Sequence, residues 1–247
     1  MLRSLCCCCV SSENSDTERQ PLLHPAPSDL NGAGSARQTR QAHNDAPTVK
    51  QMGRLVMRRL CVPELDQRFS DMAETFNEQH ESYEAMVRHI RNLRQSSGCN
   101  HDDTLSLAEC LDTIRDEHET RYRVSLKMKG YDFTLSVVPV GEGEEEPPPP
   151  HLQLAQNEMK GTSECAKATV SKGTTLQELV GWLLRSKDQM AERVKEAAGT
   201  YQEQGRLNEN LEENLKEVRR AKQLSLGYRN QAGKVLTEAA QLAGTCL

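Results

Sequence analysis

The sequence predicts a mostly α-helical protein with three parts: a disordered N-terminal tail, a central helical hairpin with a short β-prone segment, and a long C-terminal helix of the coiled-coil type. Hydrophobic residues make up 36% of the 247 positions, aromatic residues 4% and charged residues 27%, a balance typical of solvent-bathed helices. Apolar residues recur at heptad spacing in two segments. The longest apolar run, residues 5–10, is far shorter than the ~20 residues of a membrane span.

Residues 1–49 are expected to form the disordered tail. From residue 11 onward Ser, Asn, Asp, Pro, Gln and Gly dominate, and apolar residues show no period. Such a segment buries too little apolar surface to offset the entropy lost on ordering. The net charge of −5 gives no general case for nucleic-acid binding, which requires a basic surface.

Residues 50–140 are expected to form the helical hairpin. Residues 50–61 place their apolar side chains near one helical face, which favours the first helix of a bundle over a stretch lying on anionic lipid. The next helix carries a heptad stripe that includes Leu65, Phe69, Met72, Phe76, Met86 and Ile90. A second helix is capped at Ser106 and runs toward Met128, and residues 131–140 are β-prone without an identified partner.

The remainder divides into a linker and a long helix. Residues 141–173 read as an acidic, Pro-rich spacer followed by a weakly ordered segment, because a run of four prolines favours polyproline II. Residues 174–242 are expected to form one long helix capped by Thr174 or Thr175. Its stripe packs either on a partner helix or on the hairpin of the same chain, and includes Leu183, Met190, Val194, Tyr201, Asn208, Leu211, Leu215 and Val218.

Four consecutive cysteines, Cys6, Cys7, Cys8 and Cys9, lie near the start of the tail. Thioester-linked palmitate on these thiols would supply membrane affinity at about 0.8 kcal/mol per buried methylene, so two or more chains hold stably. The other five cysteines are scattered, which indicates neither a disulfide framework nor a zinc site. The sequence therefore predicts a peripheral membrane protein with reduced thiols and no metal or cofactor.

An acidic dileucine pattern begins nine residues after Cys9: Glu18 is followed, after three intervening residues, by the bulky aliphatic pair Leu22 and Leu23. Clathrin adaptor complexes bind such segments as extended peptides, with a basic patch for the carboxylate and an apolar pocket for the leucines. The pattern predicts sorting to late endosomes or lysosomes.

Residues 6–25, CCCCVSSENSDTERQPLLHP, resemble the N-terminal segment of the Ragulator subunit that anchors signalling machinery on lysosomes. Both have cysteines, a Ser-Ser-Glu-Asn stretch, acidic residues and a leucine pair in that order. Melanoregulin is similar in its cysteine run and acidic leucine motif. Leu2 stands where the Ragulator pattern has glycine. The resemblance implies attachment to a lysosome-related membrane, and the helical body resembles no family.

We therefore expect a non-enzymatic adaptor on the cytosolic face of late endosomes or lysosomes, with the plasma membrane or the Golgi as alternative locations. Its helices would recruit an unidentified helical partner or a second copy. The alternative is a SNARE-like fusion or tethering factor that acts through the C-terminal heptad helix. No phosphate-binding loop, HExxH or GxSxG motif indicates catalysis.

Overall fold

The computed structural model describes residues 53–99, 105–141 and 147–245, which lie within one compact unit, Thr48–Leu247. Within this part the chain is mostly helical, as predicted. The elements follow in the order α1 (Pro63–Ser96), α2 (Ala108–His118), β1 (Tyr122–Lys129), β2 (Asp132–Pro139), α3 (Pro150–Arg185), α4 (Lys187–Ala197) and α5 (Tyr201–Leu242). The predicted lipidation and sorting residues, Cys6, Cys7, Cys8, Cys9, Glu18, Leu22 and Leu23, lie outside the described residues.

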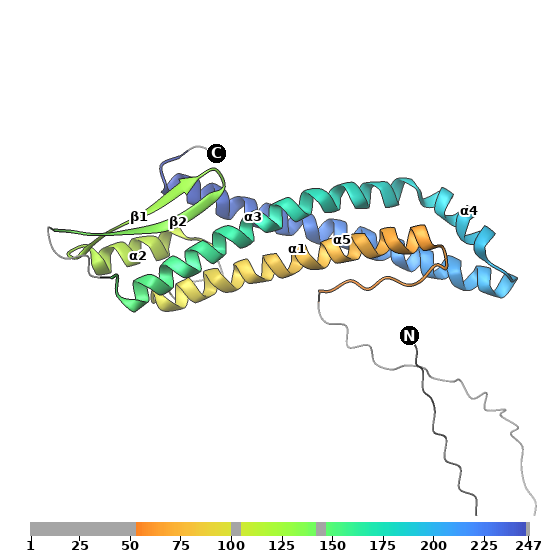
Figure 1. Ribbon diagram of the computed structural model, residues 1–247, viewed down its shortest axis with the longest axis horizontal. Coiled ribbons are helices and arrows are strands. Elements are labelled where there is room, and N and C mark those ends of the chain that lie inside the picture. The colour runs from red at the N-terminus through yellow and green to blue at the C-terminus, as the bar shows by residue number, and fades with distance from the viewer. Residues whose placement is uncertain (1–52, 100–104, 142–146, 246–247) are drawn as a thin grey trace, which may run out of the picture. The chain divides into compact units, whose positions relative to one another are not determined.

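Three long helices, α1, α3 and α5, run side by side and make the core (Figure 1). α3 packs against α1 along its length and against α5 on another side, and α2 and the two strands lie at one end. Two clusters of buried apolar side chains fill the bundle. One cluster lies around Ile90, Met159 and Val235, and the other around Phe69, Val180 and Leu215. None of the described helices is long and apolar enough to cross a bilayer.

The heptad stripe predicted for α1 is confirmed as the buried face of this helix. All six stripe residues, Leu65, Phe69, Met72, Phe76, Met86 and Ile90, are at most 1% exposed. Pro63 begins the helix, where its missing N–H costs nothing, and Gly98 at φ +67° follows its end. The predicted partner is wrong, because the principal neighbour of α1 is α3 and not α2.

The β-prone residues 131–140 find their partner in the residues just before them. β1 and β2 pair antiparallel across Gly130 and Tyr131, with Lys129 opposite Asp132. The expectation that helix continues from α2 through Tyr122 toward Met128 is wrong. Tyr122, Val124, Leu126 and Met128 alternate with polar residues at period two, which directs Val124 and Leu126 into the core.

The weakly ordered segment predicted within residues 141–173 is helical from Pro150 onward, because α3 begins there and continues through Thr174 to Arg185. Between Ala155 and Gly173 most of its buried residues are small, among them Ser163 and Ala166, and Met159 is the one large apolar residue among them. Small side chains carry little hydrophobic signal in a sequence, yet they let helix axes approach closely. The hydrophobic periodicity of this segment is therefore weak in the sequence, although the helix packs closely on its neighbours.

The single helix predicted over residues 174–242 is also wrong. The chain turns at Ala198, Gly199 and Thr200, and α5 then packs back on α4. The Thr200 hydroxyl accepts a hydrogen bond from the Glu203 N–H (3.2 Å), and the Glu203 carboxylate accepts one from the Gly199 N–H (3.0 Å). This reciprocal cap fixes the start of α5.

The turn separates the predicted stripe into buried and unburied members. Tyr201 is 90% exposed and Asn208 only half-buried, so neither belongs to the apolar seam. The other six are buried within the bundle: Leu183, Met190, Val194, Leu211, Leu215 and Val218. Of the two packing alternatives, these six residues follow the intramolecular one.

Candidate functional site: a strap held between α1 and α5

Residues 53–62, here called the strap, precede α1 and run back along it in an extended conformation. The helix expected for residues 50–61 is therefore wrong over this part. An isolated helix of about twelve residues is marginal in water. The extended chain instead offers its backbone groups to neighbouring side chains and buries Leu55 and Leu60, which are 3% and 0% exposed. Val56 is 81% exposed.

Two asparagines clamp the strap backbone from opposite helices. Leu55 N–H donates to Asn77 Oδ1 of α1 (2.7 Å), and Asn77 Nδ2 donates back to the Leu55 carbonyl (3.1 Å). Arg58 N–H donates to Asn214 Oδ1 of α5 (2.8 Å), and Asn214 Nδ2 donates to the Arg58 carbonyl (2.8 Å). Each primary amide thus satisfies both backbone groups of one strap residue, as a neighbouring β-strand would.

Two further contacts hold the C-terminal end of the strap, just before α1 begins. Asn210 Nδ2 donates to the Arg59 carbonyl (2.9 Å), and Leu60 N–H donates to Asp66 Oδ1 (2.7 Å). Cys61 then adopts φ +59°, the left-handed region that a non-glycine residue enters at a cost of about 1 kcal/mol or more. This residue reverses the chain into α1.

The other end of the strap closes over a polar and aromatic layer between the two core clusters. His80 Nδ1 and the Tyr228 hydroxyl share a hydrogen bond of 3.1 Å, and His80 Nε2 lies 3.2 Å from a Glu84 carboxylate oxygen. The Tyr228 ring stacks on Tyr83. Gly53, at φ +112°, lies so close to His80 that a β-carbon there would overlap the imidazole. Glycine is therefore required where the strap meets the middle of α1.

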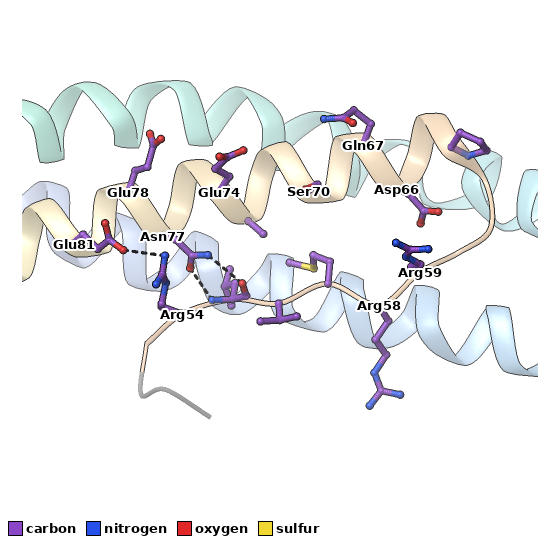
Figure 2. A pocket seen from close by; sticks show the side chains of 15 residues that line it. Arg54, Arg58, Arg59, Asp66, Gln67, Ser70, Glu74, Asn77, Glu78 and Glu81 are labelled. Atoms are coloured by element: carbon purple, nitrogen blue, oxygen red, sulfur yellow. Dashed lines mark hydrogen bonds and ion pairs between the residues drawn. The ribbon is translucent and has the colours of Figure 1, made fainter. Parts of the chain in front are cut away.

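An open groove of about 810 Å³ runs between the strap and α1 (Figure 2). The strap lines it with Arg54, Arg58 and Arg59, while the facing wall is acidic. Arg54 pairs with Glu81 (N–O 3.0 Å). The acidic side chains of this wall are Asp66, Glu74, Glu78 and Glu81. Of these side chains, Glu81 pairs with a strap arginine, whereas Glu78 pairs with Lys172 of α3 and Asp66 accepts the Leu60 N–H. Glu74 points away from the strap, and Arg58 points away from α1 (Figure 2).

The side chains of this site bind an extended segment of polypeptide. Within residues 53–99, 105–141 and 147–245, no three His, Cys, Asp or Glu side chains cluster so that they could hold a metal ion. The side chains that bind the strap backbone are neutral amides, which both donate and accept hydrogen bonds, and one carboxylate, which accepts one. Such groups recognise an extended peptide.

The three asparagines that bind the strap, Asn77, Asn210 and Asn214, were not identified from the sequence. Asn214 carried a usable signal, because it continues the apolar spacing of Leu207 and Leu211 and is only 2% exposed. A polar residue in an apolar stripe must have a hydrogen-bonding partner when buried. Its hydrogen-bond partner, Arg58, lies 156 positions away in the sequence. The spacing therefore indicates that Asn214 is buried and bonded, but not that it binds the strap.

The chain matches no protein-family model, no curated protein and no solved structure. The resemblance of residues 6–25 to lysosomal anchor segments stays a prediction.

Proposed function

We propose that this protein is a palmitoylated peripheral membrane adaptor, which recruits partner proteins to the cytosolic face of late endosomes or lysosomes through its helical bundle. The observation that carries the proposal is the run of four cysteines, Cys6, Cys7, Cys8 and Cys9, joined through a polar segment to the bundle. A palmitoyl chain has about fifteen methylene-sized groups at about 0.8 kcal/mol each, so two chains make attachment effectively stable.

The strap supports the proposal because it makes a defined connection between tail and bundle. A tail that simply continued from the first turn of α1 would join the bundle at one helix end. Here the chain first passes close to His80, near the middle of α1, and is then hydrogen-bonded to Asn77 and Asn214. Force transmitted from a membrane anchor would therefore act on a clamped segment rather than on a frayed helix terminus.

The compartment is proposed from Glu18, Leu22 and Leu23, which fit an acidic dileucine signal for clathrin adaptor complexes. Replacing both leucines by alanine should shift the protein from lysosomes toward the plasma membrane or the Golgi. Imaging against organelle markers measures this shift, and an unchanged distribution would exclude the sorting role while leaving membrane attachment intact.

The SNARE-like alternative needs an unoccupied heptad seam on the C-terminal helix. Leu211, Leu215 and Val218 of that seam are already buried in the bundle, which favours the adaptor. A fusion factor with this sequence would have to open the bundle before it could pair with other helices.

Metabolic labelling with an alkyne palmitate analogue tests the proposal. The expected result is a hydroxylamine-sensitive signal that disappears when all four cysteines are changed to serine, together with release from sedimenting organelles. Cys61→Ser is the matched control, because Cys61 is an exposed thiol of the folded part and should leave the signal intact. A quadruple variant that still sediments with organelles would overturn the proposal.

A further inference from the structure

The contacts around the strap are of two kinds: hydrogen bonds to its backbone, and packing or ion pairs with its side chains. Asn77 and Asn214 bond only to the N–H and C=O groups of Leu55 and Arg58, and Asp66 bonds only to the Leu60 N–H. Such bonds form with any residue except proline, which has no N–H. They therefore set a conformation, an extended chain, without setting a sequence.

Side-chain selection comes from two apolar anchors and from charge. Leu55 and Leu60 are buried in the core cluster that also contains Phe76 and Leu215, whereas Val56, Arg58 and Arg59 between them are exposed. Charge adds one contact, because Arg54 of the strap pairs with Glu81 of α1 (N–O 3.0 Å). These contacts favour an extended segment that carries two aliphatic side chains five positions apart, with one basic residue just before the first of them.

We infer that the surface of α1 and α5 beneath the strap is a binding site for an extended peptide with two aliphatic anchors and a basic residue just before the first of them. The strap fills this site in cis, and a partner segment of the same chemistry binds it in trans once the strap has left. Main-chain clamping, two anchor pockets and charge complementarity are the elements by which proteins bind extended peptides. The strap is the occupant that reveals the site. The inference concerns the bundle alone and does not depend on membrane attachment.

The strap competes with any partner because it is tethered. A segment joined to its site by a short linker has an effective concentration of about millimolar, so a free peptide of equal affinity cannot displace it at micromolar concentration. Weakening the anchors of the strap should therefore uncover the site. The turn at Cys61, with its positive φ, is the hinge about which the strap would leave.

The test uses the full chain, produced without lipid, and a fluorescent peptide with the sequence of residues 53–62 and Ser in place of Cys61. Fluorescence anisotropy should show saturable binding to the Leu55→Ser/Leu60→Ser variant and at least tenfold weaker binding to the unaltered protein. A peptide with proline at position 58 lacks the N–H clamped by Asn214 but keeps both leucines, and it should bind at least tenfold more weakly than the parent peptide.

The clamps provide a second arm of the experiment. Adding Asn77→Ala and Asn214→Ala to the anchor variant should weaken peptide binding at least tenfold, whereas Asn230→Ala, an exposed asparagine of α5, should leave it unchanged. If circular dichroism shows that the anchor variant has lost its helices, the titration is repeated on Arg58→Pro, which removes one clamped N–H and keeps both leucines. Absence of saturable binding to a folded variant, or equal binding of the proline peptide, would overturn the inference.

Discussion

Replacing Gly161 by alanine should destabilise the protein, although alanine is the better helix former. In the middle of a helix this exchange ordinarily stabilises by about 1 kcal/mol. A β-carbon at Gly161 of α3 would however lie 2.6 Å from the imidazole of His89 on α1. That ring is hydrogen-bonded to the Glu158 carboxylate at 2.6 Å, so it cannot move away without breaking the bond.

The net effect follows from these two opposing contributions. A hydrogen bond to a charged group contributes about 1.5–3 kcal/mol, so its loss outweighs the gain in helix propensity. We expect Gly161→Ala to lower the free energy of unfolding by about 0.5–2 kcal/mol, because the lost hydrogen bond contributes more than the gained helix propensity. Gly233→Ala in α5, where an added β-carbon meets nothing within 4 Å, should raise it by about 1 kcal/mol.

Urea unfolding followed by circular dichroism measures both changes, and a third variant tests their cause. In a His89→Ala background the obstructing ring is gone, so Gly161→Ala should become stabilising by a few tenths of a kcal/mol to about 1 kcal/mol. If Gly161→Ala stabilises the unaltered protein as much as Gly233→Ala does, α1 and α3 are not packed as closely as described. An unchanged sign in the His89→Ala background would show that the imidazole is not the obstacle.

Three further predictions concern the α5 cap, the core and the thiols. Thr200→Ala removes the cap of α5 and should cost about 1 kcal/mol in urea unfolding, and no change would show that the turn is held otherwise. Phe76→Ala should cost about 3–5 kcal/mol, whereas the exposed Tyr201→Ala should cost under about 0.5 kcal/mol, and equal costs would contradict the assigned core. Burial raises the pKa of the Cys110 thiol from 9.0 to about 12, so iodoacetamide at pH 8.5 should alkylate exposed Cys61 and spare Cys110 until urea is added, as mass spectrometry would show. Because the folded pKa is the higher one, the stability contributed by Cys110 should be lost as the pH rises from about 9 to about 12. Equal alkylation of the folded protein would contradict the buried position.

The sequence predicted α1 well and α3 poorly for one physical reason. Leu65, Phe69 and Phe76 mark their helical face because large apolar side chains have a strong preference for burial. The buried face of α3 includes Thr162 and Gly173, whose burial depends on how closely the neighbouring helices approach. That approach is a property of the assembled bundle and is not written in the local pattern.

The strap and the β-hairpin show two different limits of local reasoning. The alternation of Tyr122, Val124 and Leu126 was present in the sequence, and the error lay in extending a helix period over a strand period. The strap has no such local pattern that would predict its extended conformation. Its apolar residues fit a helix, and its extended form depends on asparagines more than 20 and more than 150 residues further along the chain.

The heptad series through the C-terminal part shows how a correct period can give a wrong topology. The spacing continues across Ala198, Gly199 and Thr200, so counting alone predicts one uninterrupted helix. A threonine followed three positions later by Glu203 is itself a start signal for a helix, and the hydrogen bonds of Thr200 and Glu203 use it. Because the turn lets α5 pack back along α3, it also brings Asn210 and Asn214 to the strap. The strap can bind between α1 and α5 because the chain turns at this local cap and does not continue as one heptad helix.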